Sequence, residues 1–265
     1  LWRFQTEGVI ARRPVANRNT LYFANGSDTL FAVDRATGKQ KWQVHRPSAL
    51  GMEIAGYSGP AVADGKVYLG FSDGHVGAYD EADGSERFAP VDLAAEAEQQ
   101  TGGDAPRYLD VDTTPIVDTI SGGISTGSNA TRVVFVAGYA GGVYALDAEP
   151  GARVWSNDQA KGVTQLYLWS QRAHKPSAGG PYAGGPTVPA QAVLVAASGM
   201  TGLWGLDPST GRELWRNKLP DGGVTQPAAV SGALLVGTTR YGVVLLSPVN
   251  GRVIDAIDVG VGVTA

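Results

Sequence analysis

Short apolar runs of strand length recur along the chain, and residues that favour turns separate them. The runs are LYFAN from Leu21, VYLGF from Val67, VVFVAG from Val133, AVLVAAS from Ala192 and ALLVGTT from Ala233. They are rich in β-branched and aromatic residues, as is typical of strands. Each run is followed by a glycine-containing turn and a second apolar run. The pattern therefore predicts pairs of antiparallel strands along the whole chain.

A tight-turn signature follows each pair of runs and marks five repeats. An Asp, or a Ser in the last copy, precedes a Gly by four residues in the pairs Asp34/Gly38, Asp80/Gly84, Asp147/Gly151, Asp207/Gly211 and Ser247/Gly251. Because Asp can accept hydrogen bonds from nearby backbone amides and Gly tolerates a positive φ, we predict a hairpin at each pair. In four copies an aromatic residue stands four positions after the glycine, and these residues are Trp42, Phe88, Trp155 and Trp215.

A proline opens a short apolar run ahead of each unit, and these residues are Pro14, Pro60, Pro115, Pro186 and Pro227. The intervals from the proline to the Asp or Ser position are 20, 20, 32, 21 and 20 residues. The long third interval contains an insertion that we predict to be a loop, Ser121 to Thr131. Each repeat thus predicts four strands, of which the first follows the proline and the fourth carries the aromatic residue.

Four antiparallel strands in a repeat of about 40–45 residues form the blade of a β-propeller. One blade cannot bury both of its faces, whereas radial stacking of blades buries them and leaves only short edges. The aromatic residue of the fourth strand is predicted to pack between neighbouring blades. The predicted fold class is therefore all-β, a β-propeller of four-stranded antiparallel blades.

The segments Leu21 to Trp42 and Leu194 to Trp215 resemble the PQQ-like β-propeller repeat, and the resemblance covers essentially the whole chain. It implies a ring of about six to eight blades, whereas five complete repeats are seen. Trp2 resembles part of the last strand of a preceding repeat, and VGVGVTA resembles the approach to a following one. We predict that residues 1–265 are a single PQQ-like propeller domain, incomplete at one or both ends. A five- or six-bladed ring that closes by itself is the alternative.

Several families share this repeat, and the resemblance implies a different function for each. They include quinoprotein dehydrogenases, BamB-type lipoproteins of the machinery that assembles outer-membrane β-barrels, and extracellular sensor domains of bacterial kinases. We expect a non-enzymatic, BamB-like protein-interaction scaffold of the bacterial cell envelope that binds a β-barrel assembly component. A PQQ- and Ca²⁺-dependent quinoprotein dehydrogenase and the sensor domain of a larger receptor are the alternatives.

The residues that could serve a dehydrogenase have structural explanations. The chain contains no cysteine, and Trp42, Trp155 and Trp215 occupy the predicted docking position of the repeat. Asp110 and Asp112 offer oxygen ligands that suit Ca²⁺, but a calcium loop normally supplies more ligands and a bend-forming glycine. A solvated or capping pair is therefore favoured. We assign no catalytic, cofactor-binding or metal-binding residue and expect no cofactor.

The charge and hydropathy of the chain limit its partners and its location. The net charge is −4, and 21 basic and 25 acidic residues are mixed along the chain, which argues against nucleic acid. No apolar run approaches the roughly 18–20 residues that span a bilayer. The chain starts at Leu1 inside a patterned segment, which indicates a processed product or a fragment. We expect it in the periplasm or cell envelope, with any outer-membrane anchor in a segment upstream of Leu1.

Two inserts interrupt the repeats, Val91 to Thr114 and Gly162 to Pro186. Inserts on propeller loops lie on the faces of the ring, where partners bind, and the second insert contains aromatic and Arg residues of the kind enriched at interfaces. The candidate partner-binding residues are Arg107, Tyr108, Leu166, Tyr167, Trp169 and Arg172. In the alternative interpretation, Leu166 to Trp169 form a bent inner strand of the fourth blade.

Overall fold

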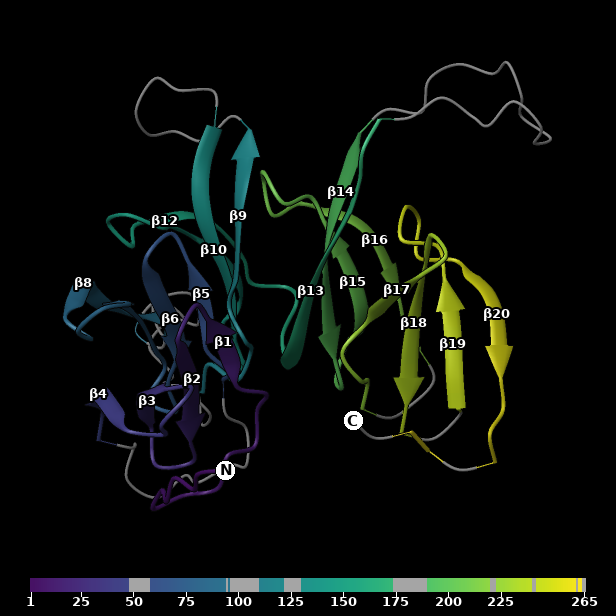
Figure 1. The fold of residues 1–265 in the computed structure, drawn as a ribbon. Coiled ribbons are helices and arrows are strands. Elements are labelled where there is room, and N and C mark those ends of the chain that lie inside the picture. Colours follow the sequence, from purple (N-terminus) through teal and green to yellow (C-terminus); the bar gives the residue numbers. More distant parts are fainter. Residues whose placement is uncertain are drawn as a thin grey trace.

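The chain folds into five four-stranded antiparallel sheets, each built from strands that are consecutive in the sequence (Figure 1). The computed structural model describes residues 1–47, 58–93, 95, 110–121, 130–173, 190–219, 223–239, 242–260 and 262–263. We number the sheets as blades 1 to 5 in chain order. This architecture confirms the predicted fold class.

The strands of the five blades are as follows. Blade 1 contains β1 (Val15–Asn17), β2 (Thr20–Asn25), β3 (Thr29–Asp34) and β4 (Gln40–His45). Blade 2 contains β5 (Ala61–Ala63), β6 (Lys66–Gly70), β7 (His75–Asp80) and β8 (Glu86–Asp92). Blade 3 contains β9 (Ile116–Ser121), β10 (Ala130–Gly138), β11 (Gly142–Asp147) and β12 (Arg153–Asn157). Blade 4 contains β13 (Val163–Gln171), β14 (Gln191–Ser198), β15 (Gly202–Leu206) and β16 (Glu213–Asn217). Blade 5 contains β17 (Ala228–Val230), β18 (Ala233–Thr238), β19 (Gly242–Leu246) and β20 (Val253–Ile257).

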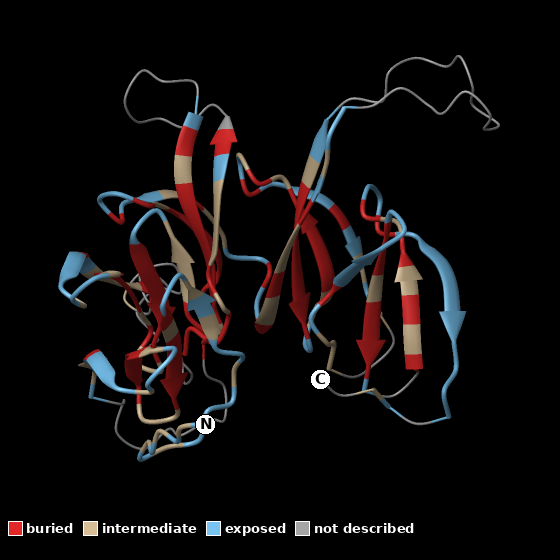
Figure 2. Cartoon of the chain, in the orientation of Figure 1, coloured by how far each residue is buried: buried red, intermediate tan, exposed pale blue. Residues whose placement is uncertain are grey.

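The hydrophobic core lies between the blades. Four clusters of buried side chains each combine residues from two successive blades, so every joint from blade 1 to blade 5 has its own core. The first strands β1, β5, β9 and β13 contact one another in turn. Figure 2 shows that burial is concentrated in the second and third strands of the blades. That residues 1–265 form a single domain stays a prediction.

The hairpins between the third and fourth strands form as the sequence predicts. In all five, the Gly amide donates to the carbonyl of the Asp or Ser four residues earlier, at 2.8–2.9 Å. The five glycines have positive φ values, from 65° at Gly251 to 76° at Gly84. Asp207 illustrates the role of the carboxylate, because its Oδ1 accepts a hydrogen bond of 2.7 Å from the Ser209 amide.

In blades 1 to 4, the aromatic residue of the fourth strand docks on the hairpin glycine of the next blade, which confirms the predicted packing between blades. A Cβ built on Gly211 would lie 2.4 Å from the Trp155 ring, so only glycine leaves room for it. The contacts of this kind are Trp42 on Gly84, Phe88 on Gly151, Trp155 on Gly211 and Trp215 on Gly251. The three indoles also donate to a hairpin carbonyl, and Trp155 Nε1 lies 2.9 Å from the Pro208 oxygen.

The two end blades differ in how their outer surfaces are covered. On blade 1, Trp2 packs against Gly38 and donates through Nε1 to the Arg35 oxygen at 3.0 Å, the same contact that the other tryptophans make. On blade 5, Asp255 stands where the aromatic residue stands in the other blades, and β20 is exposed along its whole length (Figure 2). The aromatic docking rule therefore ends at blade 4.

The first strand of blade 4 lies elsewhere than the proline pattern predicts. The prediction that this strand opens at Pro186 is wrong, because β13 occupies that place and pairs antiparallel with β14 from Val163 to Gln171. Leu166 and Trp169 are three residues apart on β13, so they lie on opposite faces of the strand and are buried in the cores on its two sides. Residues 174–189 lie outside the described residues, as do residues 122–129 of the predicted insertion Ser121 to Thr131, whose ends belong to β9 and β10.

Candidate functional site

In several blades, a Ser or Thr two positions before the proline accepts a hydrogen bond from the second strand. We call this contact a clip, because it holds the start of the blade against that strand. The Thr113 hydroxyl accepts a hydrogen bond of 2.8 Å from the Ala137 amide. Thr225 does the same for Gly237 at 2.9 Å, and the Ser58 hydroxyl accepts from Gly70 at 3.2 Å. The spacing Ser/Thr-x-Pro is present in the sequence and could have predicted these clips. They are structural contacts of the repeat.

Replacing Thr113 by Val should lower the free energy of unfolding by about 1–2 kcal/mol, because the buried Ala137 amide would lose its acceptor while side-chain volume is kept. The effect can be measured by urea denaturation. Thr113→Ser, which keeps the hydroxyl, is the control and should cost less. Equal losses for both variants would contradict the role of the hydroxyl.

Asp110 and Asp112 depart from the repeat just before this clip. Their backbone is held by neighbours on both sides: the Tyr139 amide donates to the Asp110 oxygen at 2.9 Å, and Arg12 Nη2 donates to the Asp112 oxygen at 3.2 Å. Between them, the Val111 amide donates to the Phe71 oxygen at 3.1 Å. This segment therefore ties blade 2 to blade 3 on the ring face formed by the connections between blades.

The two carboxyl groups are buried and lie close enough to influence each other. Burial, together with the negative charges of Asp112 and Asp28, raises the pKa of Asp110 to about 7. Burial also raises the pKa of Asp112 to about 6, against the opposing effect of the Arg12 charge. Asp112 Oδ1 has no hydrogen-bond partner. The pair is therefore an acceptor site with one unsatisfied buried oxygen, Asp112 Oδ1, and its negative charge would be stabilised by a cationic group.

This acceptor site does not have the composition of a metal centre. Asp28 is the third carboxylate nearby, and its two oxygens accept hydrogen bonds from the amide and hydroxyl of Ser72. Among the described residues, no group of three or more His, Cys, Asp or Glu side chains has an arrangement that could hold a metal ion. The chemistry available is therefore recognition of a donor or a positive charge.

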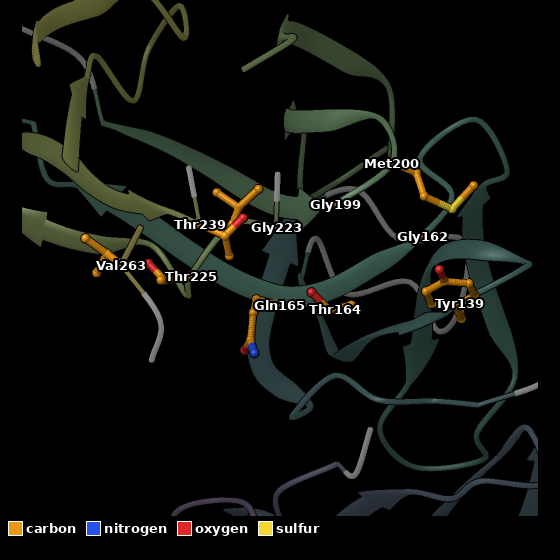
Figure 3. A pocket seen from close by; sticks show the side chains of 11 residues that line it. Tyr139, Gly162, Thr164, Gln165, Gly199, Met200, Gly223, Thr225, Thr239 and Val263 are labelled. Carbon is orange, nitrogen blue, oxygen red and sulfur yellow. The ribbon is translucent and has the colours of Figure 1, made fainter. Parts of the chain in front are cut away.

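A pocket of about 470 Å³ is lined by Tyr139, whose amide donates to the Asp110 oxygen, so the pocket lies next to this segment (Figure 3). Tyr139 and Met200 line one end, and Thr239 and Val263 line the other. Gln165, from the start of β13, lines it between these ends. The described residues of the lining include no charged side chain, and Met200 is 67% exposed, so the pocket could accept an apolar group of a partner. The sequence did not single out these residues, because they come from separate blades.

The structure separates the predicted partner-binding residues. Leu166 and Trp169 are buried in the cores on either side of blade 4, and Tyr167 is half-buried. These residues form the inner strand β13, as in the second of the two interpretations. Arg172 is exposed just after the end of β13. Arg107 and Tyr108 lie outside the described residues. Binding of a partner by these residues stays a prediction.

The described part of the chain has no helix with the length and apolar character needed to cross a membrane. The fold and the contacts above define a β-propeller protein built from a repeated four-stranded blade. The sequence profile of the outer membrane protein assembly factor BamB matches residues 1–168 and 167–254. The chain belongs to this family.

Individual relatives agree with this assignment. The chain is 26% identical to the outer membrane protein assembly factor BamB of Yersinia pestis over 180 residues, which are 64% of this chain and 40% of that protein. It is 26% identical to BamB of Legionella pneumophila (strain Paris) over 211 residues, which are 78% of this chain and 44% of that protein. The chain therefore spans less than half the length of these relatives.

Solved structures share the fold at low sequence identity. The crystal structure of BamB from Moraxella catarrhalis aligns with a TM-score of 0.66 and 19% identity, over 96% of this chain and 66% of that one. The quinohemoprotein alcohol dehydrogenase ADHIIG from Pseudomonas putida HK5 aligns with a TM-score of 0.56 and 17% identity, over 93% of this chain and 41% of that one. At these identities the likeness concerns the fold.

Proposed function

We propose that the chain is a non-enzymatic binding scaffold of the bacterial cell envelope that takes part in the assembly of outer-membrane β-barrel proteins. The observation that carries the proposal is the buried Asp110–Asp112 pair, with Asp112 Oδ1 unsatisfied, beside a pocket whose described lining is uncharged. Membership of the BamB family supplies the biological setting. A partner would place an apolar side chain in the pocket and a Lys or Arg at the surface nearby, where the charge of the buried carboxylates attracts it.

The scaffold role agrees with the way in which the aromatic residues are used. Trp42, Trp155 and Trp215 each pack on a hairpin of the next blade, so their rings serve the joints between blades. A quinone cofactor that stacked on one of them would have to displace a neighbouring blade. The location proposed for the chain is the periplasm, where β-barrel precursors and their assembly proteins meet.

The proposal is tested by binding to the periplasmic part of a β-barrel assembly protein, measured by calorimetry. Asp110→Asn should weaken binding about tenfold, since it removes a buried charge that attracts the Lys or Arg of the partner. The matched control is Asp255→Asn on the exposed strand β20 of blade 5, which should leave the affinity unchanged. Absence of binding by the unaltered chain, or dye reduction after addition of PQQ and Ca²⁺, would contradict the proposal.

A further inference from the structure

The first two strands of blades 3 and 4 extend beyond the rest of their sheets (Figure 1). β10 pairs with β9 from Ala130 onwards, but its pairing with β11 starts only at Val133. β13 and β14 pair as far as Gln171 with Gln191, whereas β14 pairs with β15 only from Leu194. In blades 1, 2 and 5 the corresponding two strands pair over three residues. Blades 3 and 4 therefore each carry a two-stranded extension at the face opposite Asp110.

Each extension has an open edge that presents backbone donors and acceptors. β9 and β13 are end strands of their sheets. The Ala148 amide donates to the Arg132 carbonyl, so the backbone polar groups of Arg132 face away from β9. Thr119 is paired with Arg132 across the two strands, and its N–H and C=O therefore point away from β10. The Leu166 carbonyl accepts from Gln226 at 3.5 Å, outside the sheet, and by alternation the Ser170 backbone also points outward.

A groove of about 590 Å³ lies between the two extensions. β9 contributes Asp118, Thr119 and Ile120, and the β13–β14 extension contributes Ser170 and Gln191 among others. The floor is the hairpin of blade 4 that starts at Asp207. The groove thus places both open edges beside a lining of mostly small and uncharged side chains.

Within the described residues, the two open edges carry few of the features that protect an edge from pairing with another strand. Natural sheets block exposed edges with Lys, Pro, bulges or very short strands. The extension of β9 reads TIS and that of β13 reads WSQ, which contain neither Lys nor Pro. The register shift of β13 lies at its other end, between Val163 and Gln165. These stretches are therefore chemically suited to accept an additional strand.

We propose that the groove between the β9–β10 and β13–β14 extensions binds an extended polypeptide segment, which adds as a strand to an open edge. Backbone hydrogen bonds give such binding its affinity, and alternating side chains fit the groove. The inference rests on the proposed function for the source of the segment, an unfolded stretch of a β-barrel protein, whose strands alternate apolar and polar residues. The edge geometry itself does not depend on that function.

The test uses an end-capped peptide of about eight residues, a usual strand length, that alternates valine and threonine. Fluorescence anisotropy with the labelled peptide should show saturable binding to the unaltered chain. Ser170→Pro or Thr119→Pro removes an outward N–H without removing a ladder hydrogen bond, and at least one of them should weaken binding about three- to tenfold. Ser170→Ala and Thr119→Ala keep the amide and should bind like the unaltered chain.

A measurement without substitutions covers the case in which a proline variant fails to fold. Amide hydrogen exchange at Thr119 or Ser170 should slow when the peptide is added. The inference would be overturned if the peptide showed no saturable binding. It would also be overturned if the peptide bound but neither proline variant weakened binding and amide exchange at Thr119 and Ser170 did not slow. Because the peptide assay needs no assembly partner and uses the opposite ring face, its failure leaves the Asp110–Asp112 binding test unaffected.

Discussion

Replacing Trp155 by alanine is expected to lower the free energy of unfolding by about 3–5 kcal/mol. The ring is 8% exposed, packs on Gly211 of the next blade and donates to the Pro208 oxygen at 2.9 Å. Its removal would leave a cavity in the joint between blades 3 and 4 and an unpaired buried carbonyl. The loss can be measured by urea denaturation followed by tryptophan fluorescence and circular dichroism.

Two companion variants show whether the joint itself is responsible. Trp155→Phe should cost only about 1 kcal/mol, because Phe88 fills the same position between blades 2 and 3 without the N–H donor. Trp2→Ala should cost less than Trp155→Ala, since Trp2 is only half-buried. If the Trp155→Ala variant were as stable as the Trp2→Ala variant, the claim that docked aromatic residues hold neighbouring blades together would be contradicted.

Asp112→Asn is expected to stabilise the fold at neutral pH by about 2–3 kcal/mol. Burial raises the pKa of Asp112 to about 6, above its usual value of 3.8, so the folded chain retains a proton that the unfolded chain releases. Stability therefore falls as the pH rises from about 4 to 6, and the full penalty is present above that range. The pKa of about 7 at Asp110 extends the fall to neutral pH.

Thermal unfolding between pH 4 and pH 8 measures this effect. The stabilisation by Asp112→Asn should be largest at pH 7–8 and vanish near pH 4, where Asp112 is protonated in both states. Asp34→Asn is the control of opposite sign, because hydrogen bonds from Thr37 lower the pKa of Asp34 and its loss should destabilise at neutral pH. If the effect of Asp112→Asn on stability did not depend on pH, the claim that Asp112 is a buried carboxylate with a raised pKa would be refuted.

The sequence was sufficient for the blades because the repeat encodes them locally. The Asp and Gly of each hairpin, such as Asp207 and Gly211, fix the turn between the third and fourth strands within five residues. The aromatic residue at a constant distance then indicates the joint to the next blade, as for Trp155. Both features depend on local chain geometry, so one sequence is enough to recognise them.

The site was harder to predict because its parts come from different blades. Asp110 and Asp112 are conspicuous in the sequence, but their burial depends on Phe71, Tyr139 and Arg12, which are remote along the chain. Likewise, the proline pattern misplaced the first strand of blade 4. There, pairing of β13 with β14 decided the structure, and no proline marks its start.

Hydrogen–deuterium exchange of the chain, with and without the periplasmic part of a β-barrel assembly protein, tests the central claim most directly. The claim is that the face carrying Asp110, Asp112 and the neighbouring pocket binds that partner. Exchange should slow at residues 110–114 and around Tyr139, while the hairpins on the opposite face, including 207–211, stay unchanged. Protection confined to those hairpins, or no change anywhere at saturating partner, would contradict the account.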